Sequence, residues 1–336
     1  MVGAVTVGLD VGGTKVLGLA VDATGRVLAE TRVPTPPDAV LGHPGGSPVS
    51  HPLIEALASV AEWLWAEVAV DPSAVGVGAP GLVDNRGVLR FAPNLPGAGG
   101  LDIAAALTTR LAGVRTVVDN DATCATVGEW AYGSAAGADD AVMVTLGTGI
   151  GGGVIAGGRV VRGASGFAGE VGHMVVDPNG PLCPCGKRGC WERFASGSGL
   201  GRLAREAAHA GRLSDVVRMA GGDPEAVRGD HVTTAALDGD PEAVVVLEEL
   251  GWWLALGLSN LALALDPAVM VVGGGLVRAV RLVLDSVRHD FDGLLEGRAY
   301  RPPLPIVPAE LGERAGAIGA AVVARSADRL PEGASR

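Results

Sequence analysis

Three cysteines and one histidine lie close together in the chain. His173 comes ten residues before Cys183, and Cys185 and Cys190 follow within the proline- and glycine-rich stretch DPNGPLCPCGKRGC. Three thiolates and one imidazole nitrogen complete the tetrahedral coordination that Zn²⁺ prefers, and they leave no position open for water. We therefore predict a structural zinc site with ligands His173, Cys183, Cys185 and Cys190; the alternative is a group of unliganded core thiols. Cys124, which lies apart, is expected to be an ordinary small apolar helix residue.

Carboxylate and amide side chains accompany the predicted zinc loop. Glu170 and Glu192 flank it, and His173 keeps a second ring nitrogen for another partner. Carboxylates and an imidazole held on a pinned loop suit hydrogen bonding to several hydroxyls of a sugar. Asn94 in FAPNLPG and Asn120 in VVDNDATC are candidates for the amide contacts. Asparagines in loops are also common turn residues, so both interpretations of Asn94 and Asn120 stay open.

A glycine turn follows the first predicted strand. In GLDVGGTK, Asp10 ends a strand and Gly12, Gly13, Thr14 and Lys15 come directly after it. Glycines let backbone N–H groups approach an anion closely, threonine and lysine add donors, and a carboxylate at the strand end can hold Mg²⁺ through water. The segment predicts phosphate binding, whereas the alternative is a turn that uses glycine for its conformation alone.

Two further glycine turns end later strands. LGTGIGGG carries Thr148 and Gly149, and VMVVGGG ends at Gly273–Gly275, with Gly274 at its centre, before a helix. A nucleotide can lie over such a helix N-terminus. No GxxxxGKS motif occurs, and no GxGxxG opens a helix, so the sequence indicates neither a P-loop nor a dinucleotide fold.

Asp121 lies where a predicted strand changes into a helix of small residues. A carboxylate at that place can act as a general base that deprotonates an alcohol as it attacks phosphorus. The alternative role for Asp121 is to cap the helix, which is common for aspartate.

The elements that must position these residues follow a repeated pattern. Residues 4–34 and 141–162 each read as three short strands joined by glycine turns, which predicts a duplicated fold. Strands alternating with helices predict an α/β architecture. The expected helices cover 52–68, 103–111, parts of 197–265, 276–289 and 315–325, with strands in AVGVGAP, RTVVDND, AVMVVGGG and PIVP. The segment from Pro34 to Pro52 is expected to be an exposed loop, and the tail from Ser326 to be disordered.

Composition and charge narrow the function classes. The 336 residues predict about two domains, and 53 glycines without a G-X-Y period exclude collagen. The formal net charge of −11 and the lack of a basic run argue against a nucleic-acid partner. The N-terminus lacks the pattern of a signal peptide, and 251–265 reads as a buried helix, so we expect a cytoplasmic protein without a membrane partner.

These motifs together resemble the ROK family of sugar kinases and repressors, and within it the chain is most similar to bacterial ATP-dependent glucokinases. The resemblance covers nearly the whole chain, through DVGGTK, GAPGLVD, PNLPG, DNDA, LGTGIGGG, GExGH, CPCGKRGCWE and GLSNLALALDPAVMVVGGGL. It implies an actin-like ATPase fold, related to ribonuclease H, with two α/β lobes, a central cleft and a zinc-bound loop. The implied small lobe comprises 1–114 and 312–330, the large lobe 115–311 with zinc loop 173–192, and 331–336 a disordered tail.

The resemblance also assigns roles to residues. It implies ATP-dependent phosphorylation of a hexose at the 6-hydroxyl, glucose first, with Asp121 as catalytic base and with Mg²⁺. The implied sugar contacts are Asn94, Asn120, Asp121, Glu170, His173 and Glu192. The implied ATP contacts are Asp10, Gly12, Gly13, Thr14, Lys15, Thr148, Gly149 and Gly274. The family further implies homodimers or homotetramers.

Two departures from the family pattern concern the substrate. Thr123 stands where the family usually has asparagine, and Ala98-Gly99-Gly100 follows PNLPG where a tryptophan is common. A kinase for fructose, allose, mannose or an N-acetylhexosamine, or one that uses polyphosphate, therefore stays open. A sugar-sensing transcriptional regulator is less favoured, because such regulators carry a helix-turn-helix region before the first glycine motif and Asp10 comes nine residues after Met1.

Overall fold

A computed structural model describes residues 5–41, 47–70 and 73–326 of the chain. Contacts divide the chain into two compact units. Unit 1 comprises 1–141, 153–169 and 310–336, and unit 2 comprises 142–152 and 170–309. The predicted small lobe ends earlier, at 114. The contacts place the following strand and helix in unit 1 because that strand pairs in register with a central strand of the same sheet.

Unit 1 is built on a five-stranded sheet with the order β3-β2-β1-β4-β7. Its strands are β1 (Thr6–Val11), β2 (Lys15–Val21), β3 (Val27–Pro34), β4 (Val75–Ala79) and β7 (Thr116–Asn120). The first three form the predicted antiparallel meander, and β4 and β7 add parallel to β1. A short hairpin of β5 (Leu82–Val83) and β6 (Leu89–Phe91) follows β4.

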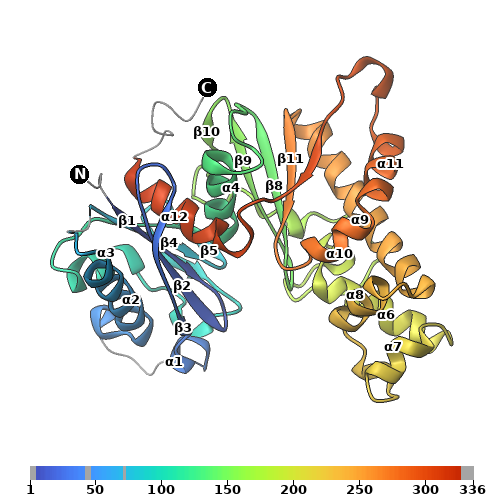
Figure 1. Cartoon of the computed structure of the whole chain (residues 1–336), viewed down its shortest axis with the longest axis horizontal. Coiled ribbons are helices and arrows are strands. Elements are labelled where there is room, and N and C mark those ends of the chain that lie inside the picture. The colour runs from blue at the N-terminus through green and yellow to red at the C-terminus, as the bar shows by residue number, and fades with distance from the viewer. Residues whose placement is uncertain (1–4, 42–46, 71–72, 327–336) are drawn as a thin grey trace. The chain divides into compact units, whose positions relative to one another are not determined.

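Alternation along the strands gives this sheet two different faces. Val7 and Leu9 of β1 belong to the core formed with α2 (Pro52–Val68) and α3 (Ile103–Arg110), whereas Leu17 and Leu19 of β2 pack with the C-terminal helix α12 (Ala315–Arg325). A period of two residues places successive side chains on opposite faces, so β2 supplies side chains to both cores. Figure 1 shows α2 and α12 on opposite sides of the blue strands.

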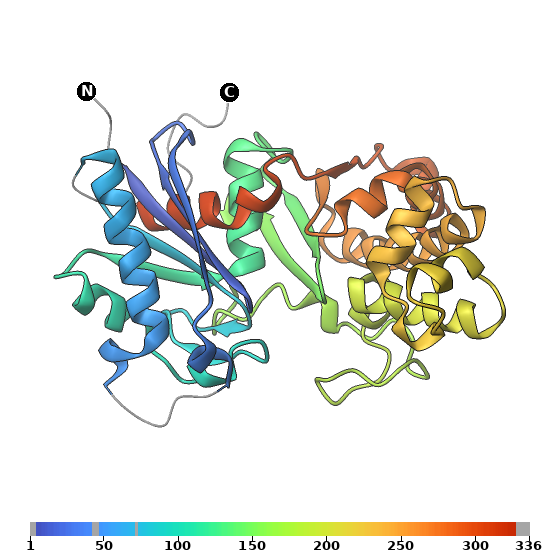
Figure 2. The same cartoon turned by 60° about the horizontal axis from the view of Figure 1, so that its bottom comes forward.

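Helix α12 lies against a surface of glycines. A Cβ atom on Gly8 or Gly76 would overlap the backbone of α12, and one on Gly319 would overlap the carbonyl oxygen of Cys124 in α4 (Asp121–Tyr132). Figure 2 shows α12, in red, running between the strands and α4. The glycines on β1, β4 and α12 are thus required for close approach of backbones.

A second five-stranded sheet repeats the strand order of the first. Its order is β10-β9-β8-β11-β12, formed by β8 (Ala141–Leu146), β9 (Ile150–Ala156), β10 (Arg159–Val160), β11 (Val269–Gly273) and β12 (Ile306–Pro308). Across both sheets, the three strands of the meander lie in reverse chain order, and two strands from later in the chain lie next to the first strand of the meander. This repetition confirms the predicted α/β duplication.

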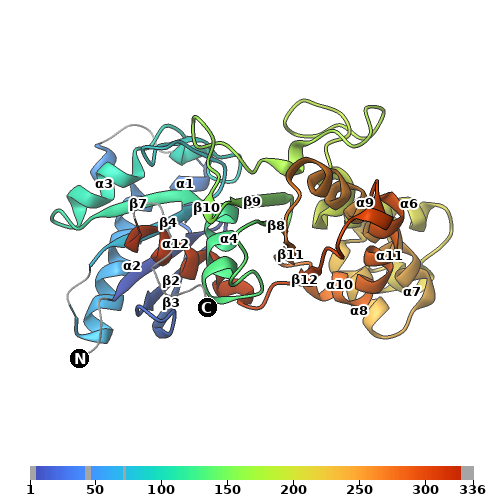
Figure 3. The same ribbon diagram turned by 90° about the horizontal axis from the view of Figure 1, so that it is seen from above.

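Unit 2 also contains a group of helices. They are α5 (Glu192–Ala195), α6 (Gly197–His209), α7 (Ser214–Met219), α8 (Gly229–Leu237), α9 (Pro241–Leu265), α10 (Val277–Leu282) and α11 (Leu284–Leu294). Helix α9 contacts α5, α6, α8 and α11, and Figure 3 shows α6 and α11 beside it. Among the described residues, α9 is the helix long and apolar enough to span a membrane, but 56% of its most apolar window is buried, as in the core of a soluble protein.

Two local predictions were wrong. The segment expected to be an exposed loop contains α1 (Pro37–Leu41), and the helix expected over 276–289 is two helices separated at Val283. The short 3-10 helix at Pro48–Ser50 also lies in that segment. The predicted tail 331–336 lies outside the described residues.

Candidate active site and metal centre

The carboxyl ends of three parallel strands bring Asp10 and Asp121 to one edge of the unit 1 sheet. Asp10 on β1 pairs with Gly78 on β4, and the next residue of β4, Ala79, pairs with Asn120 on β7. Asp121 is then the first residue of α4, directly after β7. Ligands bind at this edge in open α/β sheets, because loops and helix N-termini meet there.

The electrostatics of this edge favour a bound cation. The pKa of Asp10 is raised to about 7, first by burial and then by the nearby charge of Asp121, while Lys15 opposes the shift. Asp10 also lies against the start of α12, where its Cγ would be 2.8 Å from a Cβ on Gly316. Two partly buried carboxylates that repel one another fit the hard oxygen ligands preferred by Mg²⁺.

The helix-capping role that was considered for Asp121 falls to the preceding residue, Asn120. Its Oδ1 accepts a hydrogen bond of 3.0 Å from the backbone N–H of Thr123, and its Nδ2 donates to the carbonyl of Gly81 at 3.1 Å. Asp121 Oδ1 accepts from the N–H of Ala122 at 2.8 Å. These bonds fix the start of α4 and therefore the place of the Asp121 carboxyl group.

The first glycine turn is closed by a hydrogen bond of 2.8 Å from Gly12 N to Lys15 O. Asn94 lies beside it, since a Cβ on Gly13 would be 3.6 Å from Asn94 Cβ. Lys15 Nζ is 2.9 Å from Glu313 Oε2, so this predicted phosphate ligand is paired with a carboxylate in the structure.

Unit 2 brings the other two glycine turns together. Gly147 N donates to Gly149 O at 3.0 Å, and Leu276 N, just after the third turn, donates to Leu146 O at 3.0 Å. The N-terminal residues of α6 join them, as Gly197 N and Ser198 N donate to Gly147 O and Thr148 O. Thr148, Gly149 and Gly274 are thus neighbours, as the phosphate-binding prediction requires.

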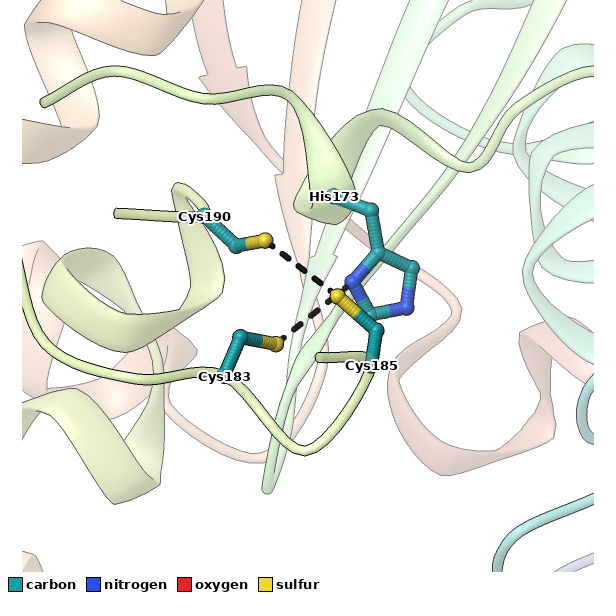
Figure 4. Close-up of side chains that lie close together, drawn as sticks. All are labelled: His173, Cys183, Cys185 and Cys190. Carbon is teal, nitrogen blue, oxygen red and sulfur yellow. Dashed lines mark hydrogen bonds between the residues drawn. The ribbon is translucent and has the colours of Figure 1, made fainter. Parts of the chain in front are cut away.

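The Cys₃His group forms a compact cluster (Figure 4). The four ligand atoms of His173, Cys183, Cys185 and Cys190 lie within 4.8 Å of one another. Cys185 Sγ is 3.5 Å from Cys190 Sγ, and Cys183 Sγ is 3.8 Å from His173 Nδ1. Zinc bonds of about 2.3 Å to sulfur and 2.0 Å to nitrogen put tetrahedral ligands about 3.5–3.8 Å apart, so these residues fit Zn²⁺. Burial raises the pKa of Cys183 and Cys190, so a bound cation is needed to hold both as thiolates.

The predicted sugar contacts of unit 2 surround this cluster. His173 Nε2, on the side of the ring away from Cys183, is 3.9 Å from Glu170 Oε2, and Glu192 Oε1 is 3.6 Å from His173 Nδ1. A Cβ on Gly149 would overlap Glu192 Oε2, so the second glycine turn touches this group. Burial raises the pKa of Glu170, His173 opposes that rise, and Glu192 adds to it.

Two buried acidic residues of unit 1, one before Asp121 and one at the far end of the helix that Asp121 begins, were missed from the sequence. Asp119, which is 5% exposed, accepts a hydrogen bond of 2.7 Å from Arg162 Nε. Glu129, fully buried at the other end of α4, accepts backbone N–H groups of Ser134, Glu310 and Leu311. Most of the residues that bond them are distant in sequence. The only local signal was that Asp119 lies within strand β7, directly after two valines.

The fold and the two groups of side chains define an actin-like α/β protein with a carboxylate edge, glycine turns and a zinc-binding loop. The chain belongs to the ROK family, whose model matches residues 6–327. It is 39% identical to a glucokinase of Streptomyces coelicolor over 97% of this chain and 99% of the relative. It is 32% identical to a glucokinase of Thermotoga maritima over 94% and 96%.

Among solved structures, the chain resembles a ROK family glucokinase from Streptomyces griseus in complex with glucose and AMPPNP. The identity is 38%, the TM-score is 0.82, and the match covers 96% of this chain and 99% of that one. Family membership and the actin-like fold predicted from the motifs are thereby confirmed.

Proposed function

We propose that this protein is an ATP-dependent glucokinase that phosphorylates the 6-hydroxyl of glucose. The observation that carries the proposal is the similarity, over nearly the full length of both chains, to glucokinases and to a glucokinase that binds glucose and AMPPNP. The glycine turns, the carboxylate edge and the zinc-binding loop supply the residues that this reaction needs. Kinases for fructose, allose, mannose or an N-acetylhexosamine, and a polyphosphate-using enzyme, are the alternatives.

We assign the proton transfer to Asp121. Its carboxylate accepts the proton of the sugar 6-hydroxyl as that oxygen forms a bond to the γ-phosphorus, and the bond from this phosphorus to the β,γ-bridging oxygen breaks to release ADP. Asn120 caps the helix that begins at Asp121 and so orients the base. Mg²⁺, held through Asp10, supplies charge neutralisation at the phosphates when bound.

We assign the remaining contacts as the motifs indicate. Asn94, Asn120, Glu170, His173 and Glu192 hydrogen-bond the sugar, and the zinc bound by His173 and three cysteines has a structural role. The donor phosphates are bound by Gly12, Gly13, Thr14, Lys15, Thr148, Gly149 and Gly274.

Replacement of the base tests this assignment. In Asp121→Asn the carboxamide keeps the shape but cannot take a proton, so we expect kcat to fall about 10²- to 10⁴-fold. Glucose affinity, measured by calorimetry, should change little. Asp102→Asn is a matched control, because Asp102 is likewise an aspartate at the start of a helix, where it caps α3 by accepting from the N–H of Ala105 at 2.9 Å. Turnover of Asp121→Asn near the wild-type rate would refute the assignment.

A panel of sugars and donors tests the substrate. We expect ATP with glucose to give the highest kcat/KM in an ADP-release assay, with polyphosphate tested by sugar phosphate formation. A higher kcat/KM for another sugar would replace glucose and leave the kinase chemistry in place. We also propose a homodimer or homotetramer in the cytoplasm, and sedimentation velocity distinguishes these oligomers from a monomer.

A further inference from the structure

Trp191 connects the metal loop to the longest helix of unit 2. It lies between the zinc ligand Cys190 and Glu192 and is completely buried. Its backbone N–H donates to Met174 O at 2.8 Å, and its indole Nε1 donates to Trp253 O on α9 at 2.7 Å. One residue thus holds both ends of the loop, because Met174 follows the ligand His173.

The indole ring occupies a notch in α9 that a glycine creates. A Cβ atom on Gly257 would overlap Cε2 and Cζ2 of Trp191, so no other residue fits there without moving the ring. Phe194 adds a second attachment, stacking on the ring of Trp253 with centroids 4.0 Å apart and planes inclined by 28°. The loop therefore rests on one short section of α9.

This arrangement determines where two predicted sugar contacts lie. Glu192 directly follows Trp191, its Oε1 is 3.6 Å from His173 Nδ1, and Trp191 N–H fixes the residue after His173. A shift of the ring moves both side chains with it. We propose that Trp191, held in the notch at Gly257, is a positioning residue that sets Glu192 and His173 for sugar binding. This inference rests on the proposed function.

The decisive experiment moves the ring without touching the site. In Gly257→Ala the new methyl group displaces Trp191, and misplacement by about 1 Å can cost about 10²-fold, so we expect kcat/KM for the sugar to fall about 10- to 100-fold. The Kd for the sugar should rise by calorimetry, whereas the Kd for ATP and the zinc content stay as in the wild type.

Compensation distinguishes positioning from general core packing. Trp191→Phe has a smaller ring that leaves room for the methyl group, so the double variant Trp191→Phe/Gly257→Ala should bind sugar more tightly than Gly257→Ala alone. Gly251→Ala is the control on the same helix, because its Cβ would be 3.2 Å from Cγ2 of Val287 on α11, a milder contact that does not involve Trp191. Trp130→Phe is the control for a lost indole donor, since Trp130 Nε1 donates to Ala138 O at 2.7 Å in unit 1.

Wild-type activity on the sugar panel is read first, and every variant is then assayed with the sugar that the wild type phosphorylates. Wild type that phosphorylates no sugar overturns the proposed function and this inference together. Active wild type with unchanged sugar Kd in Gly257→Ala, an equal loss of ATP binding, or no compensation overturns the positioning role alone. If Gly257→Ala does not fold, the sugar Kd of Trp191→Phe is compared with that of Trp130→Phe. A higher sugar Kd for Trp191→Phe supports the positioning role, and equal values overturn it.

Discussion

At the scale of single residues, ionisation of the Asp10 carboxyl group at the sheet edge has a cost to stability. Asp10 has a folded-state pKa of about 7, raised by burial and by Asp121 from an ordinary value of 3.8. The folded protein therefore keeps a proton that the unfolded chain releases between these two values. Stability is highest below about pH 4 for this group and is lost as pH rises through about 7.

We expect Asp10→Asn to weaken this pH dependence. Between about pH 4.5 and 7.5, the free energy of unfolding of the wild type should fall relative to that of Asp10→Asn, by on the order of 2 kcal/mol. Urea denaturation of protein that retains its zinc but is free of Mg²⁺ and nucleotide measures the difference. Asp84→Asn controls for surface carboxylates. Hydrogen bonds of Asp84 oppose its burial and lower its pKa from the ordinary value of 3.8, so its slope has the opposite sign and falls below the measured window. Its curve should therefore stay parallel to that of the wild type between about pH 4.5 and 7.5. Parallel curves for wild type and Asp10→Asn would contradict the expectation.

At the scale of elements, the contact of α12 with α4 and the sheet depends on the absence of side chains. Gly319 lies where a Cβ would overlap Cys124 O, and backbone cannot move aside as a flexible side chain can. The helix also begins next to Asp10 and shortly after the residues that Glu129 binds. Packing of this helix therefore bears on the carboxylate edge.

We expect Gly319→Ala to destabilise the protein by about 2–3 kcal/mol through overpacking. Gly293→Ala, in α11, is the matched control: a Cβ there would meet nothing within 4 Å, and helix propensity should stabilise the protein by about 0.5–1 kcal/mol. Thermal unfolding of both variants measures the contrast. Equal effects of the two substitutions would show that the contact with Cys124 is unimportant.

Local patterns predicted these elements, and their failures have physical reasons. The bounds of α2 and α12 follow from apolar periodicity, and the meanders follow from strands alternating with glycine turns. Helix α1 has five residues in a proline-rich segment, too short to show a period. The break at Val283 carries no glycine or proline.

The parts of the candidate site that are local in the sequence could be predicted, and the long-range pairs could not. The zinc ligands lie within 18 residues of one another, so their spacing is visible in the sequence. Asp119 with Arg162 and Lys15 with Glu313 are 43 and 298 residues apart, and only the fold brings them together.

At the scale of the whole molecule, the zinc site stabilises a loop that has little regular structure of its own. Residues 173–192 contain isolated bridges at Val175–Cys190 and Leu182–Arg188 instead of strands. A short, irregular segment buries too little apolar surface to fix its conformation, so metal binding supplies the free energy for folding it.

We expect about one zinc per chain by metal analysis. Removal by a strong chelator should lower the melting temperature and abolish sugar binding, and added Zn²⁺ should restore both. Cys185→Ser should behave as the chelated protein, whereas Cys124→Ser, far from the cluster in sequence, keeps its zinc. A chelated protein with unchanged melting temperature and sugar affinity would contradict this role.

The position of α12 in the chain has a consequence for synthesis. The sheet that it covers is complete at Asn120, but the helix ends at Arg325. At about 5–20 residues per second, a ribosome needs roughly 10 to 40 s to make the intervening chain. During that interval the glycine-lined face of the nascent sheet lacks the helix that fits it. A ribosome that stalls in the last helix therefore leaves an incomplete first unit, even though nearly all of the chain has been made.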